Sequence, residues 1–145
     1  MKSLIALNNT KLKELLFSDE TINHLKHFSE VEWLDDYDAL ADVIDAYDAC
    51  ITSWGSPRFT PKVLNKAENL KFIGHGAGTI VPYIDEQVFQ KDITVVNANY
   101  VLSRAAAEGT VAMMAAASYR LLDYSQMLKD GGWADNDVEN VPGVC

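Results

Sequence analysis

The sequence is poor in cysteine, in basic residues and in long apolar runs, and each shortage excludes a class of protein. Two cysteines among 145 residues are too few for a disulfide framework. A reduced, cytoplasmic protein is therefore expected, with Cys50 as a small buried hydrophobic residue. No apolar run reaches the roughly 20 residues that a membrane-spanning helix needs. The polar residues that follow Leu7 also exclude a secretory segment.

The balance of charge is strongly acidic. Asp and Glu number 21 against 12 Lys and Arg, which gives a formal net charge of -9. Such a surface repels nucleic acid and anionic membranes, so neither is an expected partner. A small anionic metabolite can still bind through local backbone amides. Hydrophobic residues make up 48% of the chain, which suits a globular domain with a single core.

Short apolar runs alternate with stretches of helical spacing along the first 102 residues. The expected strands lie at 3–7, 31–34, 49–54, 70–73 and 93–96, and the expected helices at 10–28, 35–44, 62–67 and 83–89. Asp35, Asp36 and Asp38 are expected to cap the second helical segment. The strand at 70–73 is apolar on both faces, as in a parallel strand covered by helices on both sides. This order predicts an α/β fold with a flavodoxin-like, Rossmann-like parallel sheet of about five strands.

The alanine-rich and methionine-rich segment 103–129 predicts a different kind of element. A continuous helix of that length would span on the order of 40 Å at about 1.5 Å per residue. Its apolar residues lie on more than one side, and such a helix is normally buried. We therefore expect a second domain or a homodimer to cover it. The predicted organisation is a substrate-binding domain at 1–102, a long interdomain or dimerisation helix at 103–129 and a linker-like tail at 130–145.

Candidate functional residues gather where two strands end. The glycine-rich run Gly76–Thr79 predicts either a tight turn that needs positive φ or a seat for an anion, with Thr79 as a hydroxyl donor. His75 is either a hydrogen-bonding partner of a substrate or a half-buried structural histidine. Trp54 ends the preceding strand at the same edge and either lines a cleft or belongs to an ordinary turn. The spacing of His24, His27 and His75 gives no metal signature, so no metal is expected.

Four segments in this order resemble a known family, the NAD-dependent D-isomer-specific 2-hydroxyacid dehydrogenases. They are Thr52–Ser56, Asn69–Thr79, Asp92–Asn97 and Ala106–Thr110. In that family two Rossmann-like domains form a cleft in which hydride passes between NAD(H) and a 2-hydroxy or 2-keto acid. The resemblance covers most of the chain and corresponds to the first, substrate-binding domain and the long helix after it.

The resemblance also implies roles for individual residues. It implies that the loop holds the substrate carboxylate through the backbone amides of His75, Gly76, Ala77, Gly78 and Thr79, with Trp54 at the same edge. Thr110 matches a position that faces the nicotinamide. The family's catalytic arginine, glutamate and histidine match no residue here, so no catalytic residue is assigned.

The dinucleotide fingerprint of the family, Gly-x-Gly-x-x-Gly between a strand and a helix, is missing from these 145 residues. The run Gly74–Gly78 does not replace it, because Val81 and Pro82 follow instead of a helix. We therefore expect a chain truncated before its nucleotide-binding motif. It should bind a small 2-hydroxy or 2-keto acid weakly, bind no NAD by itself and carry out no turnover alone.

Two alternatives remain open from the sequence. The chain could be a stand-alone dimeric interaction module, or a module that binds small carboxylates. A response-regulator-like receiver is disfavoured, because Asn8, Asn9, Thr52 and Ser53 occupy the places where that fold needs acidic residues. The sequence does not distinguish which acid binds, or NAD from NADP.

Overall fold

A computed structural model describes residues 1–7 and 9–132 of the chain. The chain divides into two compact units, Met1–Leu102 and Ser103–Cys145. Most of the tail expected at 130–145 lies outside the described residues. This division does not test the predicted roles of 1–102 in substrate binding and of 103–129 as an interdomain or dimerisation helix, so both stay predictions.

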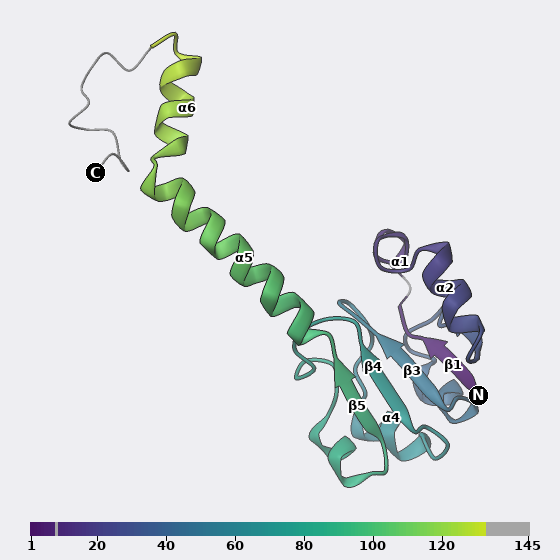
Figure 1. Cartoon of the computed structure of the whole chain (residues 1–145). Coiled ribbons are helices and arrows are strands. Elements are labelled where there is room, and N and C mark those ends of the chain that lie inside the picture. The colour runs from purple at the N-terminus through teal and green to yellow at the C-terminus, as the bar shows by residue number, and fades with distance from the viewer. Residues whose placement is uncertain (8, 133–145) are drawn as a thin grey trace. The chain divides into compact units, whose positions relative to one another are not determined.

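The first unit is built on a five-stranded parallel sheet (Figure 1). Its strands are β1 (Lys2–Ile5), β2 (Glu30–Trp33), β3 (Ala49–Thr52), β4 (Phe72–His75) and β5 (Thr94–Asn97). The strand order β2-β1-β3-β4-β5, with every neighbouring pair parallel, confirms the predicted flavodoxin-like sheet. β4 lies two residues further along the chain than the expected 70–73, because its pairing with β3 and β5 runs from Phe72 to His75.

Helices connect the strands, and local capping sets most of their ends. They are α1 (Thr10–Leu16), α2 (Asp19–Lys26), α3 (Leu40–Val43), α4 (Pro61–Lys66) and the 3-10 helices η1 (Ile44–Ala46) and η2 (Glu86–Gln90). Ser18 separates α1 from α2, because its side chain accepts the amide of Thr21 and caps α2. Pro61 opens α4 behind the capping side chain of Thr60.

Two helix predictions are wrong. The N-cap of α3 is Ala39, which makes no side-chain capping bond. Asp36 instead accepts the amide of Asp38 at 3.0 Å and forms a local turn before the helix. The helix expected at 83–89 is the shorter η2, which starts late because Asp85 is its N-cap and accepts the amide of Gln87.

The core lies on one face of the sheet, and figure 1 shows α4 behind the strands and α1 with α2 beside β1. Core side chains come from the strands, from α3 and α4 and from the short helices: Leu4, Cys50, Ile73, Leu40, Ile44, Leu64 and Val88. The other face is closed over β1, where Ile5 and Leu7 are fully buried.

Over β4 and β5 that second face is partly open. Phe72 is 36% exposed and Val96 is 45% exposed, so the expectation that both faces of β4 are covered is wrong. A Cβ placed on Gly74 would lie only 2.9 Å from Cε1 of Phe72. The phenyl ring therefore covers the Gly74 backbone in place of a packed helix.

The continuous helix expected over 103–129 is also wrong. α5 covers Asn99–Ser118 and α6 covers Leu121–Lys129. α5 begins early because the side chain of Asn97 accepts the amide of Asn99 at 3.1 Å. The break falls at Arg120, which has left-handed backbone with φ 49°. Ser118 just before it donates its hydroxyl to the Met114 carbonyl, a bond that favours bending.

Among residues 1–7 and 9–132, no helix combines the length and the apolar character needed to cross a membrane.

Candidate functional site

The candidate site forms at the carboxyl ends of β3 and β4. Thr52 and His75 are register partners there, so the loops that follow them lie together. The Gly76 amide donates to the Thr52 carbonyl at 2.7 Å, and the Ser53 hydroxyl donates to the Gly76 carbonyl at 3.3 Å. These bonds tie the two loops to each other before the glycine run begins. The sheet thus brings the predicted residues Trp54 and His75–Thr79 to one edge.

The amides of the glycine run differ in what they can offer a ligand. The Gly76 amide is already used by Thr52, and Ala77 is fully buried. The amides of Gly78 and Thr79 lie on partly exposed and exposed residues and donate to no described residue. The Ala98 amide fixes the loop from behind by donating to the His75 and Ala77 carbonyls. Two consecutive amides are therefore available at an edge where parallel sheets bind anions.

The glycine run is not a turn of positive φ. In the described part of the chain the glycines with positive φ are Gly55, at 76°, and Gly131, at 79°. That expectation for Gly76–Thr79 is therefore wrong, and it is the turn after β3 that needs a left-handed residue. A Cβ on Gly78 would lie 3.4 Å from the Asn99 side chain. That is an ordinary van der Waals distance, so the loop lies next to the start of α5 but the space there does not require a glycine.

His75 is buried behind the loop. It is 2% exposed, and its Nδ1 lies 2.9 Å from the Thr52 hydroxyl. Its Nε2 has no hydrogen-bond partner among the described residues. Burial lowers the pKa of His75, and the backbone of Thr79 opposes that shift. The ring is therefore neutral near pH 7 and lies behind the loop, packed against the Tyr83 ring.

Tyr83 is a positioning residue that the sequence did not single out. Its hydroxyl accepts the Gly55 amide at 3.3 Å, and its ring centroid lies 4.8 Å from that of His75. Its carbonyl accepts the Phe59 amide at 2.7 Å. One residue thus joins the loop after β3, the end of β4 and the approach to α4. The available signal in the sequence was a tyrosine directly after Pro82. A tyrosine ring can pack between loops while its hydroxyl forms a hydrogen bond.

Trp54 lies at the accessible side of the same edge. It is 43% exposed, in the turn where the Ser56 hydroxyl accepts the Ser53 amide at 2.8 Å. Trp54 is therefore an aromatic side chain at this edge that is open to solvent.

The other candidates lie elsewhere. Thr110 is on α5, where its hydroxyl donates to the Ala106 carbonyl at 2.8 Å. The Arg104 and Glu108 side chains form a surface ion pair of 3.2 Å one helical turn apart. His24 is on α2, and His27 is the C-cap residue of that helix. In the part of the chain that the structure describes, no three His, Cys, Asp or Glu side chains cluster as metal ligands.

The glycine run after β4 differs from the phosphate-binding turn of dinucleotide sites. A pyrophosphate is held where a glycine-rich turn runs directly into the amino end of a helix. Here the run after β4 continues through Thr79 to Asp85, and a short 3-10 helix follows at Glu86. This run therefore provides no pyrophosphate seat of that kind.

Comparisons with known proteins agree with this architecture. The family model described as D-isomer specific 2-hydroxyacid dehydrogenase, catalytic domain, matches residues 11–134. A search of curated proteins found no match. Among solved structures, the PH0520 protein of Pyrococcus horikoshii OT3 is 27% identical with a TM-score of 0.72, over 93% of this chain and 38% of that chain.

Two more distant structures support the fold. A phosphoglycerate oxidoreductase from Rhizobium etli is 19% identical with a TM-score of 0.71, over 100% of this chain and 45% of that one. A D-lactate dehydrogenase from Lactobacillus jensenii, solved with NAD+, is 21% identical with a TM-score of 0.64, over 94% of this chain and 42% of that one. The chain thus spans less than half the length of each. With the family match running from α1 past α6, the chain belongs to the D-isomer-specific 2-hydroxyacid dehydrogenase family.

Proposed function

We propose that the chain is the substrate-binding part of a 2-hydroxyacid dehydrogenase-like oxidoreductase and holds the carboxylate of a 2-hydroxy or 2-keto acid. One observation carries this proposal. The amides of Gly78 and Thr79 are accessible and donate to no described residue, at the edge of the sheet where such folds bind ligands. The Thr79 hydroxyl accepts the Val81 amide at 3.4 Å and keeps its own proton to donate to a carboxylate oxygen.

The surroundings suit a small, weakly held anion. The overall charge of -9 repels anions, so affinity depends on these few hydrogen bonds. Trp54 offers a face for the rest of the acid, and His75 with Tyr83 keeps the loop in place from within. A neutral His75 adds no charge to the seat. We therefore expect a dissociation constant on the order of 1 to 10 mM.

We infer that these residues bind the acid without turning it over. The family's hydride donor or acceptor is NAD(H), and the D-lactate dehydrogenase from Lactobacillus jensenii was solved with NAD+. Here the glycine run after β4 differs from the phosphate-binding turn of dinucleotide sites, and the sequence holds no Gly-x-Gly-x-x-Gly run. Thr110 uses its hydroxyl within α5, so a contact to nicotinamide through it stays a prediction.

A titration followed by amide resonances tests the proposal. The purified chain, labelled with nitrogen-15, is titrated with D-lactate and glyoxylate, with chloride at matched ionic strength as the blank. The largest shifts are expected at Gly78 and Thr79. Thr79→Ala should weaken binding about threefold by removing one hydroxyl donor, while the exposed Thr94 of β5 provides the matched control Thr94→Ala. Shifts confined to other parts of the sheet, or none at 50 mM acid (roughly five times the weaker expected constant), would overturn the assignment.

A separate assay tests the absence of turnover. The chain is mixed with NAD+ and D-lactate, or with NADH and glyoxylate, and absorbance of NADH is followed. No change above the blank is expected. Turnover that scales with the concentration of the chain would contradict this part of the proposal while leaving the carboxylate seat intact.

A second candidate function, a dimeric interaction module, is favoured by one observation. In the second unit, α5 and α6 contain no buried residue, and Met113, Met114 and Leu122 are 67%, 64% and 84% exposed. Exposed apolar patches of this kind mark association surfaces. We propose that a second copy of the chain covers them.

A further inference from the structure

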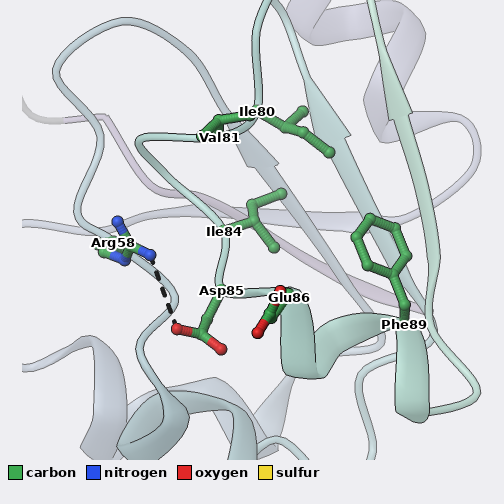
Figure 2. Close-up of a pocket in the computed structure, with 7 residues that line it drawn as sticks. All are labelled: Arg58, Ile80, Val81, Ile84, Asp85, Glu86 and Phe89. Carbon is green, nitrogen blue, oxygen red and sulfur yellow. Dashed lines mark ion pairs between the residues drawn. The ribbon is translucent and has the colours of Figure 1, made fainter.

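A second concave site lies on the first unit, and its lining includes neither Gly78 nor Thr79. It is a pocket of about 470 Å³, a volume typical of ligand sites. Figure 2 shows Val81, Ile84 and Phe89 around it, with Arg58, Asp85 and Glu86 along one side. The carboxylate proposal uses none of these side chains.

The floor of the pocket is held in place by the backbone. Ile84 is 6% exposed and forms a parallel bridge with Phe59. The Asp85 amide donates to the Phe59 carbonyl at 3.0 Å, and the Asp85 side chain caps η2. The pocket is therefore preformed, so a ligand that enters it orders little of the chain.

The rim of the pocket is apolar and exposed. Val81 is 73% exposed and Phe89 is 69% exposed, and both line the same hollow above the buried Ile84. Single exposed apolar residues are ordinary, but two that face one preformed hollow leave a surface suited to another apolar side chain.

The charges beside the rim leave an excess of one carboxylate. Arg58 lies 3.6 Å from the Asp85 carboxylate and donates to the Pro82 carbonyl at 3.5 Å. Asp85 therefore neutralises Arg58. Glu86 forms no ion pair with any described residue. The site is thus negative next to an apolar hollow, on a chain of net charge -9.

We propose that this pocket binds a peptide segment of another protein that presents a large apolar side chain next to lysine or arginine. The apolar side chain enters between Val81 and Phe89 onto Ile84, and the cation lies beside Glu86. The acidic surface of the whole chain raises the rate of encounter with a basic segment. A second copy of this chain is a poorer occupant, because the two copies repel each other at this acidic site.

Three short peptides test the proposal on the full chain. Acetylated and amidated Lys-Phe-Lys, Lys-Ala-Lys and Glu-Phe-Glu are titrated while the methyl resonances of Ile80, Val81 and Ile84 are followed. Lys-Phe-Lys is expected to shift all three, with Lys-Ala-Lys at least about fivefold weaker because it lacks the apolar anchor. Glu-Phe-Glu is expected to bind at least about fivefold more weakly as well.

Variants separate the two halves of the site. Phe89→Ala should weaken Lys-Phe-Lys about fivefold and Glu86→Gln about threefold. Phe28, 65% exposed on the turn after α2, and Glu20 on α2 give the controls Phe28→Ala and Glu20→Gln, which should change nothing. Equal binding of the three peptides, or equal effects of control and test variants, would overturn the proposal. So would phenethylamine binding as tightly as the peptide, since the pocket would then be a small-molecule site.

Discussion

At the scale of single residues, His75 shows how the site depends on burial. Its ring lies between the Thr52 hydroxyl and the Tyr83 ring, with Nε2 unpartnered. Protonation would place a charge in a desolvated position, and the backbone of Thr79 offsets only part of that cost. The lowered pKa follows from that desolvation. The same burial links the stability of the first unit to pH.

His75 therefore predicts a loss of stability in mild acid. Its pKa is lower in the folded chain than in the unfolded chain, so the unfolded state binds more protons as pH falls below about 6.5. The stabilising contribution is complete above that pH and declines as pH falls toward the lowered value. Urea unfolding of the natural chain should lose more stability between pH 7.5 and pH 5.5 than His75→Gln does. Parallel pH profiles would show that His75 does not titrate in this way.

Tyr83 predicts a local effect on the turn after β3. Tyr83→Phe keeps the ring against His75 and removes the acceptor of the Gly55 amide. A destabilisation of about 0.5 to 1 kcal/mol is expected from the lost hydrogen bond, together with faster hydrogen exchange at Gly55. Tyr119→Phe on the exposed segment after α5 serves as the matched control. Unchanged exchange at Gly55 would remove Tyr83 from its positioning role.

At the scale of elements, the break between α5 and α6 rests on one strained backbone. Arg120 adopts φ 49° without being glycine, and its guanidinium pairs with Asp123 at 2.9 Å. Arg120→Gly should raise the thermal midpoint above that of Arg120→Ala by roughly 2 to 4 °C, since both lose the ion pair and only glycine relieves the strain. Melting followed by circular dichroism makes the comparison. A lower midpoint for the glycine variant would favour a straight helix through residue 120 in solution.

Elements were also the level at which the sequence was most informative. The positions of the strands along the chain followed from apolar runs separated by Gly, Pro and polar residues, which are local signals. The helix break was missed because neither Gly nor Pro stands at 119–120. The apolar run around Phe72 predicted that a helix covers this face of β4. In the structure the Phe72 ring lies over the Gly74 backbone instead.

The candidate site was predicted in position more than in detail. Trp54 and His75–Thr79 reach one edge because parallel strands β3 and β4 end there. Which amides are free depends on contacts between segments far apart in sequence, such as the bond from the Gly76 amide to the Thr52 carbonyl, and no local pattern predicts them. The role of Tyr83 depends on the same long-range pairing.

At the scale of the whole molecule, the exposed apolar residues of the second unit predict association. A hollow of about 520 Å³ is lined by Met113, Ala116, Ala117, Leu122 and Asp123. Light scattering should give about twice the 16.1 kDa chain mass at micromolar concentration. Leu122→Asp should shift the chain toward monomer about tenfold, while Leu15→Asp on α1, where Leu15 is 74% exposed, should not. A monomer for the natural chain at high concentration would rule out the proposed dimer.

The segment between β4 and η2 gives the first unit one further property. Thr79 belongs to the carboxylate seat and Val81 to the rim of the pocket, with Ile80 between them holding the amides of Tyr83 and Ile84 through its carbonyl. The two proposed sites thus share one turn. Thermodynamic linkage then requires symmetry: whatever factor a peptide in the pocket applies to acid affinity, the acid must apply to peptide affinity. If that factor differs from one, the affinity for the partner changes when the acid is bound.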